Sequence, residues 1–198
     1  MEQVNEAGRD WLLQCAINQA EAVRLWQDDP ATPLAMATGS HFDAVVVSNR
    51  LGLETLDLIS KHALPFTPAL LDVRAHKVAL LLPPRSERVF TTLLQNVQDP
   101  IDNLHYLAED GFLVVPGPRP EDSSRYQWVA PPVGRPDASK LRAAAVGLAV
   151  CQAAERLDQR AIPHGSVYQS ARIYPVRAVP HRATTPQTAD IAWPEASQ

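Results

Sequence analysis

The sequence predicts an α+β domain in which a mixed β-sheet is backed by helices. Segments with helical periodicity alternate with short strands rich in β-branched residues. Pairs of strands joined by short turns interrupt this alternation, which argues against a purely parallel sheet. The chain has 198 residues and is 45% hydrophobic, which is enough for a buried core without disulfides.

The first elements follow from periodicity and from proline. Apolar residues recur at three- and four-residue steps from about Glu6 to Asp28, which predicts one helix that ends before Pro30. A short strand is expected over 33–38. The next strand, 42–47, is almost wholly apolar, as expected of a central strand covered on both faces. It leads into a loop over 48–52 that contains Gly52.

A helix and a hairpin follow. The helix is predicted over 53–62, and its expected core side consists of Leu53, Leu56, Leu58 and Ile59. Two paired strands are expected at 70–72 and 78–82, with residues 74–77 at the bend.

The second half begins with a helix over 86–95, capped by Ser86. Strands are expected at 111–116 and 126–129. A last helix runs from the cap residue Ser139 to about Arg160. The residues of this helix expected to face inward are Leu141, Ala145, Leu148 and Leu157.

The domain is expected to cover residues 1–162, followed by an irregular or disordered tail over 163–198 without periodicity. The sequence contains no signal peptide and no apolar run long enough to span a membrane, so we expect a cytoplasmic protein. The formal charge of −4 and pI of about 5.8 argue against a general nucleic-acid binder, although a local basic cleft remains compatible with them.

Common chemical motifs are absent from the sequence. There is no glycine-rich phosphate loop and no Gly-x-Ser-x-Gly elbow, and the six histidines lack metal-ligand spacing. Cys15 and Cys151 are expected to be small buried hydrophobes. Trp11, Trp26 and Trp128 fit core positions better than a base-stacking platform.

A series of fragments carries a resemblance to a known family. In order, they are residues 22–30, 34–39, 42–52, 64–68, 109–116 and 126–128. Their order and spacing resemble the N-terminal domain of bifunctional DNA primase/polymerases, especially its shortened, divergent actinobacterial members. The resemblance covers about residues 10–160 and implies an archaeo-eukaryotic primase-like fold.

The resemblance also implies a metal site whose acids are missing here. Active members hold divalent metals and the incoming nucleotide with an Asp-x-Asp pair at the end of the central strand, a histidine and a further acid. Counting back from Gly52 places that pair near Val46 and Ser48, neither of which is a carboxylate. Asp43 is a poor replacement, because its offset of three from Val46 directs it to the opposite face of the strand.

Other residues are weaker candidates. His76 lies near the position of the family's histidine, where a polar turn residue is the simpler interpretation, and Arg74 and Lys77 beside it could form a small anion site. His105 is the nearest match to the family's last acid. The neighbouring acids are Asp102 and Asp110, and Asp110 with Gly111 is more simply a turn.

These observations lead to three hypotheses. The first is a catalytically degenerate primase/polymerase-like domain that binds or regulates, with a nucleotide, a nucleic acid or a protein as its partner and no metal cofactor. The second is a residual nucleotidyltransferase that uses Mg²⁺ or Mn²⁺ at a relocated site built from Asp43, Asp102 or Asp110 with His76 or His105. The third is a protein-interaction module that acts through a sheet edge or the tail.

Overall fold

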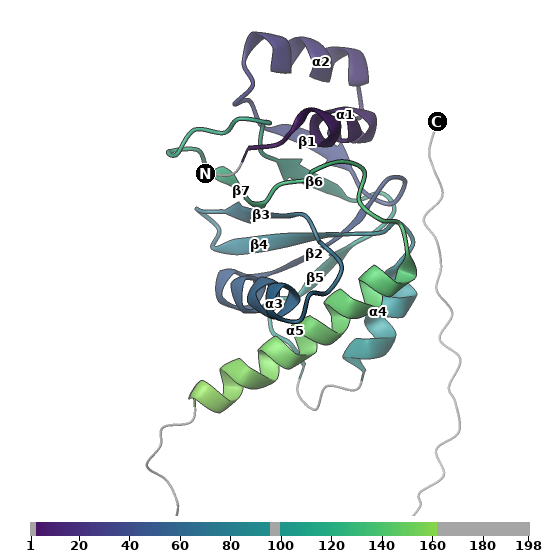
Figure 1. Cartoon of the computed structure of the whole chain (residues 1–198), viewed down its shortest axis with the longest axis vertical. Helices are drawn as coiled ribbons and strands as arrows, with labels where there is room; N and C mark the ends of the chain where they lie inside the picture. Colours follow the sequence, from purple (N-terminus) through teal and green to yellow (C-terminus); the bar gives the residue numbers. More distant parts are fainter. Residues whose placement is uncertain (1–2, 96–99, 162–198) are drawn as a thin grey trace, which may run out of the picture. The chain divides into compact units, whose positions relative to one another are not determined.

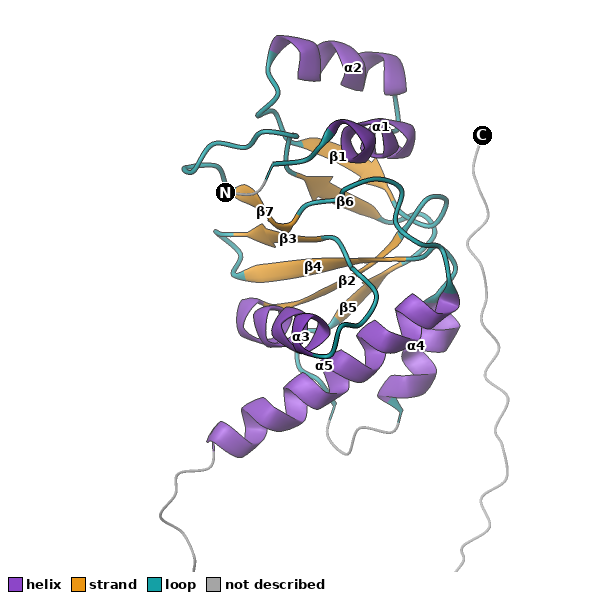
Figure 2. Cartoon of the chain, in the orientation of Figure 1, coloured by secondary structure: helices purple, strands orange, loops and turns teal. Residues whose placement is uncertain are grey.

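The computed structural model describes residues 3–95 and 100–161, and its elements belong to the compact unit Met1–Pro163. Helices lie on both sides of a β-sheet (Figures 1 and 2). The tail expected over 163–198 lies outside the described residues, as does Trp193. Within the described part of the chain, no helix combines the length and the apolar composition needed to cross a membrane.

Five strands form the main sheet. Their spatial order is β5 (His105–Leu107), β2 (Asp43–Ser48), β4 (Lys77–Leu82), β3 (Ala69–Asp72) and β7 (Tyr126–Ala130). A second sheet pairs β1 (Leu34–Ala37) with β6 (Phe112–Val115). Each of these pairings is antiparallel. The α+β class is therefore confirmed.

Three helices cover one face of the main sheet: α3 (Asn49–Lys61), α4 (Glu87–Leu94) and α5 (Lys140–Ala161). Val45 and Val47 of β2 point to this face and pack with residues of α3 and α5, such as Leu58 and Val150. The burial of these side chains provides the hydrophobic contribution that holds the helices on the sheet.

The other face of the main sheet packs against the two-stranded sheet and the first helices, α1 (Glu6–Cys15) and α2 (Gln19–Asp28). Trp11, Trp26 and Trp128 are all buried in this second core, as predicted. Cys15 is also buried, whereas Cys151 is only partly buried. Both faces of β2 are thus covered, which explains its continuous apolar sequence.

The prediction of a single helix over 6–28 is wrong, because two helices occupy this segment. Ala16 has an extended backbone and forms an isolated bridge with Met36 of β1. The second helix then starts anew, because the Asn18 side chain accepts a hydrogen bond from Glu21 N at 3.2 Å. The side-chain amide of Asn18 also donates a hydrogen bond to the Glu21 carboxylate at 3.1 Å, which holds the capping side chain in place.

The prediction of a loop over 48–52 is also wrong, because α3 begins directly after β2. Ser48 caps this helix, and its hydroxyl accepts a hydrogen bond from Leu51 N at 3.4 Å. Gly52 lies in the first turns of α3, against Val78 of β4. A Cβ at position 52 would lie 2.4 Å from the Val78 side chain, so the helix can approach the sheet this closely only with glycine there.

Three side chains expected in the core are exposed instead. Leu53 of α3 is 44% exposed, and Leu141 and Leu148 of α5 are 70% and 58% exposed. The buried face of α5 consists mainly of small residues: Ala143, Ala145, Val146, Ala149, Val150 and Ala153. Strand β5 was not predicted, whereas the remaining strands and the 69–82 hairpin agree with the expectation within two residues.

Candidate functional site

The strand registers place two rows of side chains on the face of the main sheet that points toward β6. Paired residues in an antiparallel sheet project to the same side. One row runs across β5, β2, β4 and β3 through His105, Val46, Ala79 and Leu70. The next row runs across β2, β4, β3 and β7 through Ser48, Lys77, Asp72 and Tyr126. Val46 and Ser48, the positions where the resemblance places an acidic pair, belong to these two rows.

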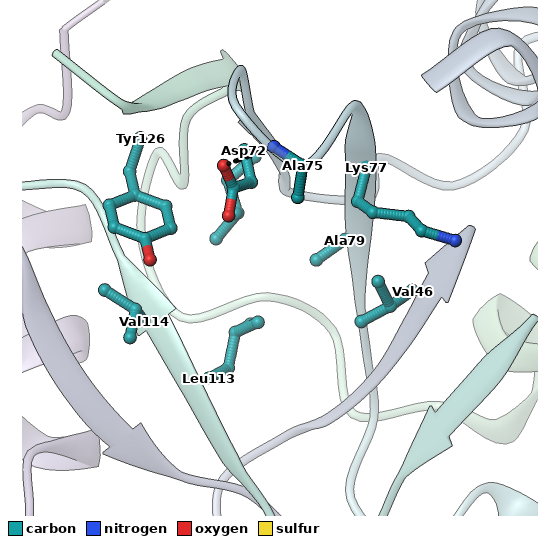
Figure 3. Close-up of a pocket in the computed structure, with 9 residues that line it drawn as sticks. Val46, Asp72, Ala75, Lys77, Ala79, Leu113, Val114 and Tyr126 are labelled. Carbon is teal, nitrogen blue, oxygen red and sulfur yellow. Dashed lines mark hydrogen bonds between the residues drawn. The ribbon is translucent and has the colours of Figure 1, made fainter. Parts of the chain in front are cut away.

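A hollow of about 250 Å³ lies over these rows (Figure 3). Its walls come from β2, β3, β4 and β7 and from Leu113 and Val114 of β6. Most of the lining is aliphatic, including Val46, Leu70 and Ala79. The polar groups of the hollow come from Asp72, Lys77 and Tyr126.

Lys77 supplies the cationic group of this hollow. Its ammonium donates a hydrogen bond to the Asn103 carbonyl oxygen at 3.3 Å. Lys77 lies directly opposite Asp72 in the β3–β4 ladder, but the two form no ion pair. In Figure 3 the lysine side chain extends away from Asp72. Its charge is therefore not neutralised by the carboxylate in its own row.

Asp72 is committed to structural contacts. Its carboxylate accepts three hydrogen bonds from the Arg125 guanidinium at 2.7, 3.0 and 3.2 Å, and two from the backbone N–H groups of Arg74 and Ala75. The hydrogen bonds from Arg125 are the main cause that holds the pKa of the Asp72 carboxyl below its ordinary value. The Arg125 guanidinium also stacks on the Tyr126 ring at 4.9 Å. These contacts join the hairpin turn to β7.

Asp43 points to the opposite face from Val46, as strand alternation predicts. It is fully buried, and Oδ2 accepts hydrogen bonds from Ser86 N at 2.9 Å and from the Tyr106 hydroxyl at 2.7 Å. Burial is the main cause that raises the pKa of the Tyr106 hydroxyl, and the hydrogen bond to Asp43 raises it further. Ser86 was expected to cap α4 with its side chain, but its hydroxyl makes no cap bond. The Asp43 carboxylate instead holds the backbone N–H of Ser86, the residue just before the helix.

The histidines and the hairpin arginine lie at the surface. His76 is exposed with a positive φ of 53°, and its carbonyl accepts a hydrogen bond from Asn49 N. Arg74 is exposed in the same turn and does not line the hollow. His105 is exposed on the edge strand β5, directly opposite Val46. Of the expected anion site, Lys77 alone lines the hollow.

The acids of the relocated-site hypothesis do not converge. Asp102 is exposed in the turn before β5, and Asp110 is exposed in the turn before β6 with a φ of 65°. Asp43 is buried on the other face of the sheet. Across residues 3–95 and 100–161, no group of three or more His, Cys, Asp or Glu side chains is placed to hold a metal ion.

Sequence reasoning did not single out two polar residues of this hollow. Asp72 ends β3 and Tyr126 begins β7, and they are paired across the ladder although 54 positions separate them. Alternation along each strand predicts which side chains share a face, but it cannot predict which strands are neighbours. The available signal was a polar residue at or beside one end of each predicted strand, because such residues form one polar row when the strands pair.

Comparison with known proteins supports the family resemblance that the order of the sequence fragments indicated. Residues 3–145 match the family model described as the N-terminal domain of bifunctional DNA primase/polymerase. No curated protein and no solved structure matches the chain. The match covers all the strands, the first four helices and the start of α5.

Proposed function

The chain belongs to the bifunctional DNA primase/polymerase N-terminal domain family, and we propose that it is a catalytically degenerate member that works as a binding or regulatory module. The observation that carries the proposal is the chemistry of the two rows beside the hollow. Valine occupies position 46, and the serine at position 48 uses its hydroxyl to cap α3. Neither supplies a carboxylate to a hard divalent cation.

The rest of the hollow supports the same proposal. Asp72 is the carboxylate in its lining, and the Arg125 ion pair and the two turn amides already occupy its oxygens. The family's metal ions would require carboxylate oxygens that are free to coordinate them. The residues at this position therefore do not fit the divalent metal ions that the family uses.

Template-dependent primer synthesis tests the proposal directly. The purified chain is expected to incorporate no nucleotide with either Mg²⁺ or Mn²⁺, whereas an active member of the family serves as the positive control. Robust incorporation by the chain, abolished by chelation of the metal, would overturn the proposal.

Restoring the acids tests whether Val46 and Ser48 are the positions that matter. The double variant Val46→Asp/Ser48→Asp is expected to bind Mn²⁺ at least about tenfold more tightly than the unmodified chain in a calorimetric titration, because it adds two charged oxygen ligands to one face of β2. Val46→Asn/Ser48→Asn is the matched control, with similar volume and no added charge. Equal Mn²⁺ affinity in the two variants would contradict this assignment of the positions.

The binding role has its own test. The cation of the hollow is Lys77, so an anionic ligand such as ATP or a short single-stranded DNA is expected to bind more weakly to Lys77→Ala than to the unmodified chain. Arg74→Ala is the control, since Arg74 lies in the neighbouring turn outside the hollow. Failure of both ligands to bind would remove nucleotides and nucleic acids from the proposal and leave a protein partner.

A further inference from the structure

A second hollow is lined by the loop that joins α3 to β3 and the loop that joins β7 to α5. It has a volume of about 280 Å³. The first loop contributes Pro65 and Phe66, and the second contributes residues 133–137. None of these residues lines the hollow beside Val46, so the two hollows are separate sites.

Large apolar side chains of this second hollow are open to solvent. Phe66 is 47% exposed and Val133 is 63% exposed, and both line the hollow. The rings of Pro65 and Pro136 add to its apolar surface. A pocket for a small molecule encloses most of the ligand, so its walls are largely buried. Walls as exposed as these, with an aromatic residue and an arginine among them, are typical of a surface on which another protein docks.

Arg135 supplies an uncompensated positive charge to this surface. Its side chain is exposed and lines the hollow. Among the residues that the structure describes, its guanidinium has neither an ion-pair nor a hydrogen-bond partner. The acid of the lining, Asp137, is engaged elsewhere, because its Oδ1 accepts a hydrogen bond from Ser139 N at 2.9 Å.

Asp137 is associated with a different arginine. Arg142 is 2% exposed, and its Nε donates a hydrogen bond to the Asp137 carbonyl oxygen at 2.7 Å. Burial lowers the pKa of Arg142, and the charge of Asp137 partly opposes this shift. Two arginines therefore accompany one aspartate in this region, and the unmatched positive charge is the solvent-exposed one, Arg135.

We propose that this hollow is a docking site for an extended peptide segment of a partner protein, which packs a large apolar side chain against Phe66 and Val133 and pairs an adjacent acidic side chain with Arg135. Apolar burial supplies attraction, and the guanidinium selects for a carboxylate because their hydrogen-bonding geometries match. The volume of the hollow is below the roughly 300 Å³ at which small-molecule pockets begin, so it has room for one anchoring side chain. A partner can reach all three side chains as they stand, because each is exposed.

Short capped peptides of defined composition test the site. Each is an acetylated and amidated hexapeptide of glycine and serine that carries one leucine, phenylalanine or tryptophan and one glutamate within three positions of it. Binding to the full chain is followed by the anisotropy of a neutral fluorophore on the peptide. At least one peptide is expected to bind with a Kd below about 1 mM. Replacing its glutamate by glutamine is expected to raise the Kd about threefold to fivefold, the range for an exposed ion pair.

Two variants assign the two halves of the site. Phe66→Ala is expected to raise the Kd of the glutamate and glutamine peptides alike, about fivefold or more. Arg135→Ala is expected to weaken the glutamate peptide alone, so that the preference for glutamate disappears, whereas Arg135→Lys retains part of it. Phe112→Ala and Arg24→Ala are the matched controls, because they truncate exposed residues outside the hollow and are expected to leave the Kd unchanged.

Four results would overturn the proposal. The first is the absence of binding by every peptide at millimolar concentration. The second is equal affinity for the glutamate and glutamine peptides, a comparison that leaves the protein unchanged and so does not depend on any variant folding. The third is peptide binding that neither Phe66→Ala nor Arg135→Ala weakens. The fourth is self-association of the chain that Phe66→Ala abolishes, measured by sedimentation, which would make a second copy of the chain the occupant.

Discussion

Single side chains of β2 decide the chemistry available on each face of the sheet. Val46 faces the hollow beneath β6, and Asp43 faces the helices. This opposition was predictable from the sequence, because alternation along a strand is fixed by backbone geometry. The donors to Asp43 were not predictable, because Ser86 and Tyr106 are 43 and 63 positions away in the chain.

The contact of Gly52 with β4 predicts an unusual sign for a glycine substitution. Replacing a helical glycine by alanine ordinarily stabilises a protein by about 0.5–1 kcal/mol. Gly52→Ala is expected to lower the free energy of unfolding by about 1–3 kcal/mol instead, because the new Cβ would lie 2.4 Å from the Val78 side chain. Urea unfolding measures the change. A stabilised variant would show that α3 does not approach the sheet this closely.

The buried thiol of Cys15 predicts a dependence of stability on alkaline pH. Burial, partly offset by the charge of Arg135, raises the pKa of Cys15 from 9.0 to about 12. Above pH 9 the unfolded chain therefore loses a proton that the folded chain retains, and the free energy of unfolding falls as the pH rises. From pH 8 to 10 this group is expected to contribute a loss of about 1.4 kcal/mol.

Comparison of the unmodified chain with Cys15→Ala isolates this effect. Tyr106, whose pKa is also raised, adds a decline of the same sign to both proteins. The variant's unfolding free energy, measured in urea, should therefore fall less steeply between pH 8 and 10. Parallel pH profiles would contradict the inaccessibility of the Cys15 thiol.

At the scale of elements, the sequence predicted which helices and strands are present better than it predicted where they begin and end or which helix faces are buried. The break between α1 and α2 depends on Asn18, which caps a new helix. The apolar residues recur with helical spacing on both sides of the break, so their periodicity does not reveal it. In α5 the large residues Leu141 and Leu148 suggested the wrong buried face. Small residues allow α5 to pack closely on α3 and α4, so size rather than hydropathy alone determines which face is inside.

The orientation of α5 predicts different effects for two neighbouring substitutions. Leu148→Gln is expected to change the free energy of unfolding by less than about 0.5 kcal/mol, because the side chain is 58% exposed. Val150→Ala removes two methyl groups from a fully buried site and is expected to cost about 1–3 kcal/mol. Thermal and urea unfolding of both variants measure the difference. A larger loss for Leu148→Gln would mean that this face of α5 is covered in the protein as it exists in solution.

At the scale of the whole molecule, the hollow beside Val46 exists because two sheets meet. Leu113 and Val114 reach it from the two-stranded sheet, and Lys77 and Tyr126 reach it from the main sheet. The order and spacing of the fragments that resemble the family were enough to predict that Val46 and Ser48 occupy the positions of the family's acidic pair. It did not predict the aliphatic wall or the engagement of Asp72 by Arg125, because both depend on packing between segments distant in sequence.

The last helix predicts where the folded unit can be shortened. The family match ends at residue 145, but Val146 and Val150 of α5 are fully buried in the core shared with Val45. Burial of each of these two valines is worth about 1.5–3 kcal/mol, a large fraction of the stability of a domain of this size. A chain of residues 1–145 is therefore expected to lose cooperative unfolding and to bind a hydrophobic dye.

A chain of residues 1–163 is the matched control, because it retains every element of the described core. It is expected to keep the thermal midpoint of the full chain within a few degrees, as measured by circular dichroism. If residues 1–145 melted cooperatively at the same midpoint, α5 would be an appendage and not part of the core. If residues 1–163 melted far below the full chain, residues 164–198 would contribute to stability, and the boundary of the folded unit would lie beyond α5.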